Sequence, residues 1–284
     1  MGRIVYVNGE YVREDDARIS VFDRGFLFAD GVYEVSAVID GKLVDNEAHL
    51  LRLGRSLAEL EMGCPVPIAD ITAIQHRLIA ENDLAEGMVY LQVSRGVADR
   101  DFGFPKEEKP SLVLFTQARN VAGNPAAARG ITVASQPDIR WARRDIKTVQ
   151  LLAQSLAKQA ALSAGADDAW MMEDGFVTEG SSNNAFIVTT DGVLVTRQLG
   201  TDILHGITRR AVLEIAAEEG LTVEERPFTI AEAQGAAEAF STSATTFVMP
   251  VVGIDGKTVS QGVPGPVTRK LRARYIEIAR DTAV

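Results

Sequence analysis

Hydrophobic and polar positions alternate with a period of two along much of the first 118 residues. In "RIVYVNGEYV" the Asn8-Gly9 pair separates two alternating runs, which predicts a β-hairpin, and "GVYEVSAVIDGKLV" repeats this pattern around Asp40-Gly41. Apolar residues spaced three and four apart then predict helices. Besides the hairpins, the elements expected in this part are helices over 47–62 and 69–82 and strands near 88–95 and 111–117.

The Ala-, Gly-, Asn- and Pro-rich stretch "ARNVAGNPAAARG" follows, and we interpret residues 119–130 as a linker. Beyond it, strand and helix patterns alternate. The expected elements are strands at 131–135, 168–173, 184–190, 222–227, 237–242 and 246–252 and helices at 149–163, 207–219 and 265–281. We therefore predict an α/β and α+β protein with a small domain over 1–118, a large domain over 131–284 and a ligand-binding cleft between them.

Composition limits the classes of partner. The chain has 284 residues, 46% of them hydrophobic, and a net charge of -10, which argues against nucleic acid or an anionic membrane and favours a small molecule. No apolar run reaches membrane-spanning length, no signal sequence is recognisable, and the single cysteine, Cys64, is typical of a reducing compartment. We therefore expect a cytoplasmic protein. The three histidines lack the spacing of metal ligands, so no metal site is expected.

The lysines differ in their surroundings. Six of the seven are expected on turns, charged loops or polar helix faces: Lys42, Lys106, Lys109, Lys158, Lys257 and Lys270. Lys147 instead comes just before a helix whose apolar stripe we expect to be buried, with Lys158 facing water on the opposite side. The stripe consists of Val149, Leu152, Leu156 and Ala160.

At that position Lys147 can point into the domain cleft. Partial desolvation and the neighbouring Arg143 and Arg144 would favour its neutral, nucleophilic form. An ion pair with Asp145, or a solvated lysine in a first helical turn, remain open alternatives for this segment.

Three further segments offer polar groups at the ends of predicted elements. "FVTEGSSNNAF" places Glu179 before a tight turn, which by itself is typical of a hairpin loop. "LHGITRRAV" puts Gly206 before a helix start, where free backbone N–H groups attract phosphate. "AFSTSATT" adds Ser243 and Thr245. An amine, a carboxylate and a phosphate cradle together suit pyridoxal phosphate, whose protonated ring withdraws electrons from a carbanion.

"RRDIKTVQLL", "VTEGSSNN", "GITR" and "AEAFSTSATT", in this order, resemble the signature of the class IV (fold type IV) pyridoxal-phosphate aminotransferases over essentially the whole chain. Within the class, "DRGFLFADGVYEV", "YLQVSRG" and "DIRWARRDIK" are most similar to the D-amino acid aminotransferases. The resemblance implies a fold type IV enzyme of two domains, with pyridoxal 5'-phosphate in the cleft between them, and a homodimer.

The resemblance also implies roles for individual residues. Lys147 matches the lysine that forms a Schiff base with the cofactor and shuttles the proton of the α-carbon, and Glu179 matches the partner of the ring nitrogen. The other cofactor-binding positions match Arg52, Leu204, Ile207, Thr208, Ser243 and Ala244. Ala244 stands where the family often has threonine, so a hydroxyl contact is lost. A surface position for Arg52 and a core position for Leu204 remain alternatives.

For the substrate carboxylate, Tyr33 and Arg100 match two of the three residues used by the D-amino acid enzymes. Arginine suits this task because its fork binds a carboxylate bidentately. The third residue, a histidine in that family, is Phe102 here. The phenylalanine would weaken binding of the substrate carboxylate, allow other amines to bind, or be offset by Arg143. A solvated position of Arg100 on a loop remains an alternative.

The sequence thus predicts a transaminase that moves an amino group from a D-amino acid, such as D-alanine, to a 2-oxo acid. The alternatives within the class are a branched-chain L-amino acid transaminase, an (R)-selective amine transaminase and aminodeoxychorismate lyase, and Phe102 keeps the amine transaminase open. A non-catalytic pyridoxal-phosphate carrier is the alternative from a different class of function.

Overall fold

The computed structural model describes residues 2–284, which divide into two compact units. The first contains the chain up to Val121 together with Ile146–Gln150 and Arg280–Val284, and the second contains Ala122–Asp145 and Leu151–Ala279. A short helix, α4 (Pro125–Arg129), forms within the stretch interpreted as a linker. The domain limits at 118 and 131 stay a prediction.

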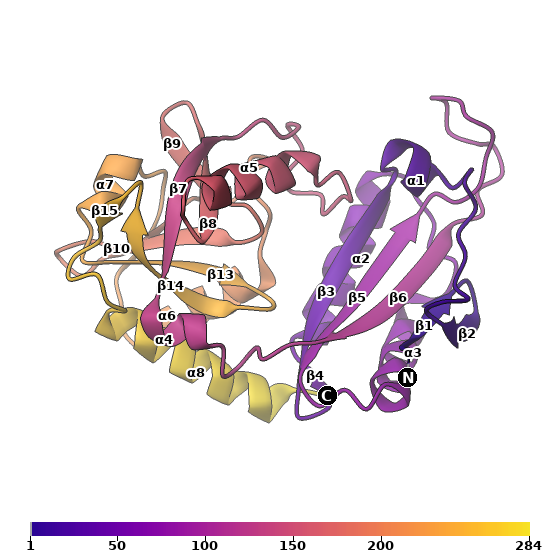
Figure 1. The fold of residues 1–284 in the computed structure, drawn as a ribbon, viewed down its shortest axis with the longest axis horizontal. Helices are drawn as coiled ribbons and strands as arrows, with labels where there is room; N and C mark the ends of the chain where they lie inside the picture. The colour runs from indigo at the N-terminus through magenta and orange to yellow at the C-terminus, as the bar shows by residue number, and fades with distance from the viewer. Residues whose placement is uncertain (1) are drawn as a thin grey trace. The chain divides into compact units, whose positions relative to one another are not determined.

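The first unit contains an antiparallel sheet and three helices (Figure 1). Its elements are β1 (Ile4–Val7), β2 (Glu10–Arg13), α1 (Arg24–Phe28), β3 (Gly31–Ile39), β4 (Lys42–Leu43), α2 (Asn46–Glu59), α3 (Ile68–Glu81), β5 (Gly87–Ser94) and β6 (Ser111–Ala118). The strand order is β2-β1-β6-β5-β3-β4. The hairpin predicted at Asn8-Gly9 is confirmed, and φ angles of 50° and 102° give these two residues the left-handed conformation that a tight hairpin turn requires.

Helices α2 and α3 bury the apolar face of this sheet. Leu53 and Leu57 of α2 and Leu78 of α3 are completely or almost completely buried, because their spacing places them on the sides of the helices that face the strands. Buried valines and leucines of β3, β5 and β6 complete the core. The sequence prediction of these two helices is therefore confirmed, with small differences at their ends.

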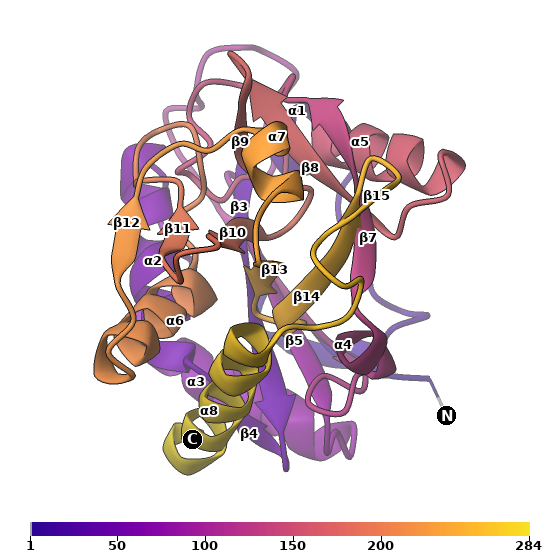
Figure 2. The same ribbon diagram turned by 90° about the vertical axis from the view of Figure 1, so that its left-hand side faces the viewer.

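The second unit surrounds a larger mixed sheet (Figure 2). Its remaining elements are β7 (Ile131–Pro137), α5 (Leu152–Ser163), β8 (Asp168–Glu173), β9 (Phe176–Gly180), β10 (Asn184–Val188), β11 (Leu194–Thr196), α6 (Ile207–Glu218), β12 (Val223–Glu225), α7 (Ile230–Gln234), β13 (Glu238–Ser243), β14 (Phe247–Ile254), β15 (Lys257–Thr258) and α8 (Pro266–Thr282). The order is β12-β11-β10-β13-β14-β7-β8-β9, with β15 beside β14. The predicted combination of α/β and α+β architecture is confirmed.

Helix α5 does not bury the stripe that its sequence predicted. It begins at Leu152 rather than 149, and Leu152 and Leu156 are 74% and 53% exposed. The helix packs on β7 and β8 through Ala157 and Ala161 (Figure 1), because small side chains allow it to approach the sheet closely. The prediction of a buried leucine stripe was therefore wrong.

Lys158, on the same helix, was predicted to face water opposite that stripe. Its Nζ instead lies 3.1 Å from a carboxylate oxygen of Asp168, and the side chain is 40% exposed. The charge is thus paired with the residue that begins β8.

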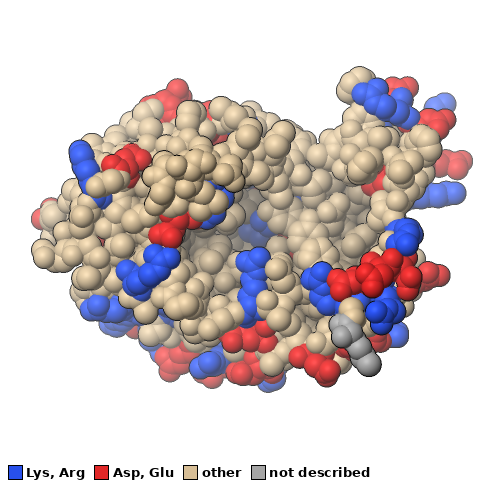
Figure 3. Space-filling model, in the orientation of Figure 1, with Lys and Arg blue, Asp and Glu red and all other residues tan. Residues whose placement is uncertain are grey.

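Charged side chains of both signs are interspersed on the face of the molecule drawn in Figure 3. Between residues 2 and 284, no helix has the length and apolarity needed to cross a bilayer. Within the same residues, no three histidine, cysteine, aspartate or glutamate side chains come together as metal ligands would.

Candidate active site

Lys147 belongs to a short extended segment that runs beside the start of β3. The amide of Tyr33 donates to the carbonyl oxygen of Lys147 over 3.0 Å, and the amide of Val149 donates to Gly31 over the same distance. These bonds place Nζ of Lys147 4.2 Å from the centroid of the Tyr33 ring. The structure therefore brings the predicted amine and the predicted substrate-binding tyrosine together.

The observed exposure agrees with the elimination of five of the other six lysines but not with that of Lys158. Lys147 and Lys158 are half-buried, whereas the other five lysines are exposed. Arg143 and Arg144, expected to act on Lys147, have carboxylate partners of their own. Arg143 pairs with Asp145 over 3.0 Å, and Arg144 pairs with Glu173 over 2.8 Å. Their positive charges are thus largely compensated.

Arg52 is buried on the inner side of α2, so the alternative of a surface arginine was wrong. Its Nε and Nη2 donate to the two carboxylate oxygens of Glu34 over 2.7 and 2.8 Å. His49, one turn earlier, bonds to the same carboxylate over 2.8 Å. Burial raises the pKa of Glu34, but Arg52 and His49 outweigh it and hold this pKa at about 2. The arginine fork is thereby fixed in one orientation.

Arg100 and Phe102 lie on an exposed loop of the first unit. The guanidinium carbon of Arg100 lies 5.3 Å from the ring centroid of Phe28 and 5.6 Å from that of Phe102. Phe102 is 78% exposed. The side chain at the position of the family histidine thus presents an apolar surface beside the arginine.

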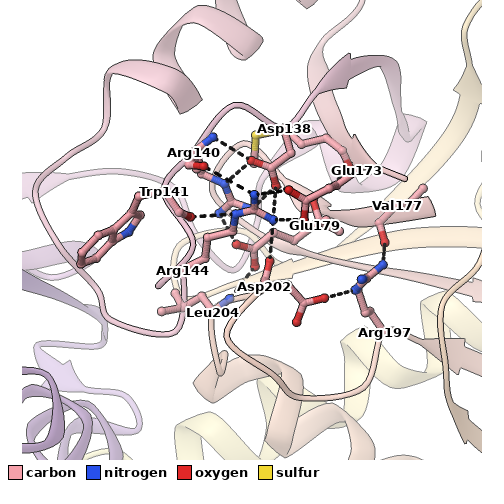
Figure 4. A network of polar contacts seen from close by, with 12 residues as sticks. Asp138, Arg140, Trp141, Arg144, Glu173, Val177, Glu179, Arg197, Asp202 and Leu204 are labelled. Carbon is pink, nitrogen blue, oxygen red and sulfur yellow. Dashed lines mark hydrogen bonds and ion pairs between the residues drawn. The ribbon is translucent and has the colours of Figure 1, made fainter. Parts of the chain in front are cut away.

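Glu179 lies at the end of β9 in the second unit, in a network of charged groups (Figure 4). Its Oε1 accepts a hydrogen bond from Nη1 of Arg140. Its Oε2 accepts from the side-chain amide of Asn184 over 2.9 Å and from the backbone N–H of Leu204 over 3.1 Å. Leu204, which is half-buried rather than part of the core, therefore contacts Glu179 through its backbone.

The carboxylate of Glu179 retains capacity for one more donor. A carboxylate offers about four lone-pair positions, and the described residues fill three of them, one on Oε1 and two on Oε2. Burial raises the pKa of Glu179, although Arg140 acts in the opposite direction. A buried carboxylate with a raised pKa and a remaining acceptor position suits a cationic N–H donor.

The N-terminus of α6 lies beside this carboxylate. Gly206 caps the helix, and a Cβ at this position would lie 2.0 Å from Oδ1 of Asn184, so any other residue would force the Asn184 side chain to move. Ile207 and Thr208 form the first turn, whose backbone N–H groups lack partners inside the helix and suit a phosphate. Asn184 thus connects the helix start to Glu179.

Ser243 and Ala244 lie where β13 ends and turns into β14. The hydroxyl of Ser243 bonds to the hydroxyl of Thr246 over 2.7 Å. Thr242, which pairs with Asn184 across the sheet, is buried, and its hydroxyl has no hydrogen-bond partner among the described residues. A buried hydroxyl without a partner next to this turn fits a site that accepts a polar ligand.

Sequence reasoning missed the groups that hold Glu179 and Arg52 in place. Arg140 and Asn184 donate hydrogen bonds to Glu179, and Glu34 accepts hydrogen bonds from Arg52. The arginine-rich "RWARRD" run and the second asparagine of "SSNN" were visible signals. Arg140 and Glu34, however, lie 39 and 18 residues from their partners Glu179 and Arg52, so sequence spacing could not reveal these two pairs.

Residues 31–254 match the model of the amino-transferase class IV family, and the chain belongs to this family. It is an aminotransferase, and the enzymes of this class depend on pyridoxal phosphate. The predicted family is therefore confirmed.

Two curated relatives show how far this similarity extends. The chain is 37% identical over 272 residues to the D-alanine aminotransferase of Staphylococcus epidermidis, covering 95% of this chain and 96% of the relative. It is 38% identical over 275 residues to the D-alanine aminotransferase of Listeria monocytogenes, covering 96% and 95%.

Solved structures of the family share the fold. The Escherichia coli branched-chain amino acid aminotransferase superposes with a TM-score of 0.90 at 24% identity, covering 98% of this chain and 95% of the other. The branched-chain aminotransferase of the archaeon Thermoproteus uzoniensis, solved with norvaline, gives 0.87 at 25% identity, covering 98% and 95%.

Proposed function

We propose that the protein binds pyridoxal 5'-phosphate and transfers the amino group of a D-amino acid, such as D-alanine, to a 2-oxo acid. The observation that carries the cofactor assignment is the buried Glu179 carboxylate with one acceptor position left for a ring N–H. The similarity to the two D-alanine aminotransferases supports the choice of donor.

The residues divide the work of binding between the two units. Glu179 would hold the proton of the ring nitrogen, and the α6 N-terminus with Thr208 and Ser243 would bind the phosphate. Arg52 would add a cation to the groups that bind the phosphate, and Leu204 would pack against the ring. When bound, the cofactor supplies an aldehyde that exchanges amines and a protonated ring that accepts electrons. A cleft between two domains stays a prediction.

Lys147 and Tyr33 would act at the reacting end. Lys147 would supply the amine that holds the cofactor, and its Nζ would move the proton at the α-carbon of the substrate. Tyr33 limits the space around Nζ, since its ring lies 4.2 Å away. Tyr33 and Arg100 would bind the substrate carboxylate.

Cofactor absorbance in the presence of single amines tests this function. D-alanine is expected to remove the absorbance band of the bound cofactor, whereas L-leucine and (R)-1-phenylethylamine leave it unchanged. Conversion by L-leucine would favour a branched-chain enzyme, and conversion by the amine would favour an amine transaminase. Absence of a cofactor band after addition of pyridoxal 5'-phosphate would contradict the cofactor assignment.

Lysine variants identify the reacting amine in the same assay. Lys147→Ala should abolish both the band and transamination. Lys158→Ala, which removes the other half-buried lysine, is the matched control and should leave both unchanged.

We also propose a homodimer that forms through an exposed aromatic patch of the first unit. The patch consists of Phe22, Phe26, Val97, Phe102 and Phe104, all more than half exposed. Backbone hydrogen bonds, such as that from Ala98 to Phe22 over 3.2 Å, connect its two segments. An apolar surface of this kind marks an interface. In sedimentation, Phe26→Asp should release monomers and the control Phe176→Asp should not, whereas a monomeric wild-type protein would contradict the proposal.

A further inference from the structure

We propose that Asp138 is a positioning residue that divides the donor fork of Arg140, so that Glu179 keeps an acceptor position and a negative charge for the cofactor ring nitrogen. This inference rests on the proposed function. It concerns how the site selects a protonated nitrogen heterocycle, and it depends on contacts within the second unit alone.

The geometry of Arg140 carries the proposal (Figure 4). Its Nε donates to Oδ1 of Asp138 over 2.9 Å, and its Nη2 donates to Oδ2 over 2.6 Å. Only Nη1 remains for Glu179. An arginine free of Asp138 could present its whole fork to Glu179 and occupy both carboxylate oxygens, as arginine–carboxylate pairs commonly do.

Asp138 is itself held in a fixed orientation. The hydroxyl of Thr178, the residue before Glu179, lies 2.6 Å from Oδ2 of Asp138. The backbone N–H of Arg140 donates to Oδ1 over 3.2 Å. Burial raises the pKa of Asp138, but Arg140 and Thr178 outweigh it and hold this pKa below its usual range. Asp138 is therefore a charged, immobile partner for the arginine.

The charges of the network favour one further cation. Asp138, Glu173 and Glu179 supply three carboxylates, and Arg140 and Arg144 supply two guanidinium groups. One negative charge is left when all five are ionised, and Glu179 is the buried carboxylate with an acceptor position to spare, since Glu173 is 40% exposed to solvent. A protonated ring nitrogen would neutralise the network. Without the charge of Asp138 the five positions would already be neutral, and the ring proton would add an unpaired buried charge.

The test compares two cofactors that differ at the ring nitrogen. Pyridoxal 5'-phosphate and its 1-deaza analogue, which has carbon in place of the ring nitrogen, are titrated into each cofactor-free full-length variant. The readout is the ratio of their dissociation constants. In the wild-type protein the natural cofactor should bind more tightly.

Asp138→Asn should reduce this preference at least tenfold and change the affinity for the analogue less than threefold. Asp138→Glu should restore most of the preference. Glu224→Gln is the matched control, because it removes one of the two carboxylates that share Arg226, outside this network, and it should leave the preference unchanged. Thr178→Val, which alters no charge, should shift the ratio of dissociation constants in the same direction as Asp138→Asn. If the Asp138→Asn protein does not fold, the Thr178→Val protein serves as the test.

An unchanged ratio in Asp138→Asn, or in Thr178→Val where Asp138→Asn does not fold, would overturn the inference. Equal loss of affinity for both cofactors would overturn it too, because a general structural role for Asp138 would then explain the result. Failure of the wild-type protein to bind either cofactor would instead contradict the proposed function.

Discussion

Glu34 in the first unit and Glu179 in the second are both buried carboxylates that bond to an arginine, yet their pKa values are displaced in opposite directions. The fork of Arg52 is directed at Glu34, and His49 adds a further bond, so this carboxylate has a pKa of about 2. Arg140 gives its fork to Asp138 and a single N–H to Glu179, and burial then raises the pKa of Glu179.

The comparison shows that a buried carboxylate paired with an arginine does not necessarily serve only to stabilise the fold. A fully paired carboxylate holds its arginine in place and has little to offer a ligand. A buried carboxylate that is incompletely paired is stabilised when a bound group supplies a cation. We therefore expect substitutions of the two glutamates to affect different properties.

Glu34→Gln should have the largest effect, and the effect should be on stability. Loss of the carboxylate charge leaves Arg52 buried without its counter-ion, which costs about 3–5 kcal/mol of unfolding free energy. Urea denaturation of the cofactor-free protein measures this loss. Glu81→Gln, in an exposed pair with Arg77, is the control and should change stability by less than about 1 kcal/mol. Equal effects of the two substitutions would contradict the assignment.

Acid should remove the stabilisation that Glu34 provides. Its pKa falls from an ordinary 4.5 to about 2 on folding, so its contribution is fully present above pH 4.5 and is lost as the pH falls toward 2. A change of this size corresponds to about 3 kcal/mol. The stability difference between wild-type and Glu34→Gln proteins, followed by denaturation from pH 6 to pH 2, should shrink through this window. A difference that stays constant would refute the pairing.

Glu179→Gln should reduce activity with little loss of stability. Glutamine has no negative charge with which to stabilise the protonated ring nitrogen. Loss of one such electrostatic contact slows catalysis by roughly 100-fold or more. Because the pKa of Glu179 is raised, its ionisation opposes folding of the cofactor-free protein at neutral pH. Unfolding of this form should therefore need no less urea than wild type. If the Glu179→Gln protein were as unstable as the Glu34→Gln protein, the two glutamates would not differ in their contribution to stability.

Asn184→Ala should produce the smallest change. It removes one neutral donor from Glu179, and such a bond contributes about 1 kcal/mol, or roughly a fivefold change in cofactor affinity. Fluorescence titration with pyridoxal 5'-phosphate measures it. Asn183→Ala, whose amide bonds to Asp168 instead, should stay within about twofold of wild type by the same titration. An equal loss in both would assign the effect to the turn rather than to Glu179.

Local patterns predicted much of the fold. The Asn8-Gly9 hairpin, the leucine spacing of α2 and the helix start after Gly206 all reflect rules that act over a few residues. The one-turn helices α1, α4 and α7 were missed because five residues do not establish a period. The face of α5 was wrong because the close approach of Ala157 to the sheet overrides the leucine pattern.

Only the site residues that lie in recognisable sequence motifs could be predicted. Lys147 and Glu179 were found from their neighbours in the sequence. The pairs that set their surroundings join residues far apart, such as Arg140 with Glu179 and Arg52 with Glu34. The partition of an arginine fork between two carboxylates is a property of the folded chain, and no local pattern records it.

The most direct test is the nitrogen-15 chemical shift of pyridoxal 5'-phosphate, labelled at its ring nitrogen and bound to the wild-type protein. The account predicts the shift of a protonated ring nitrogen at neutral pH, because Glu179 has one acceptor position and the network one negative charge to offer. A shift typical of an unprotonated pyridine would contradict the account, because Glu179 would then be a fully satisfied structural carboxylate like Glu34.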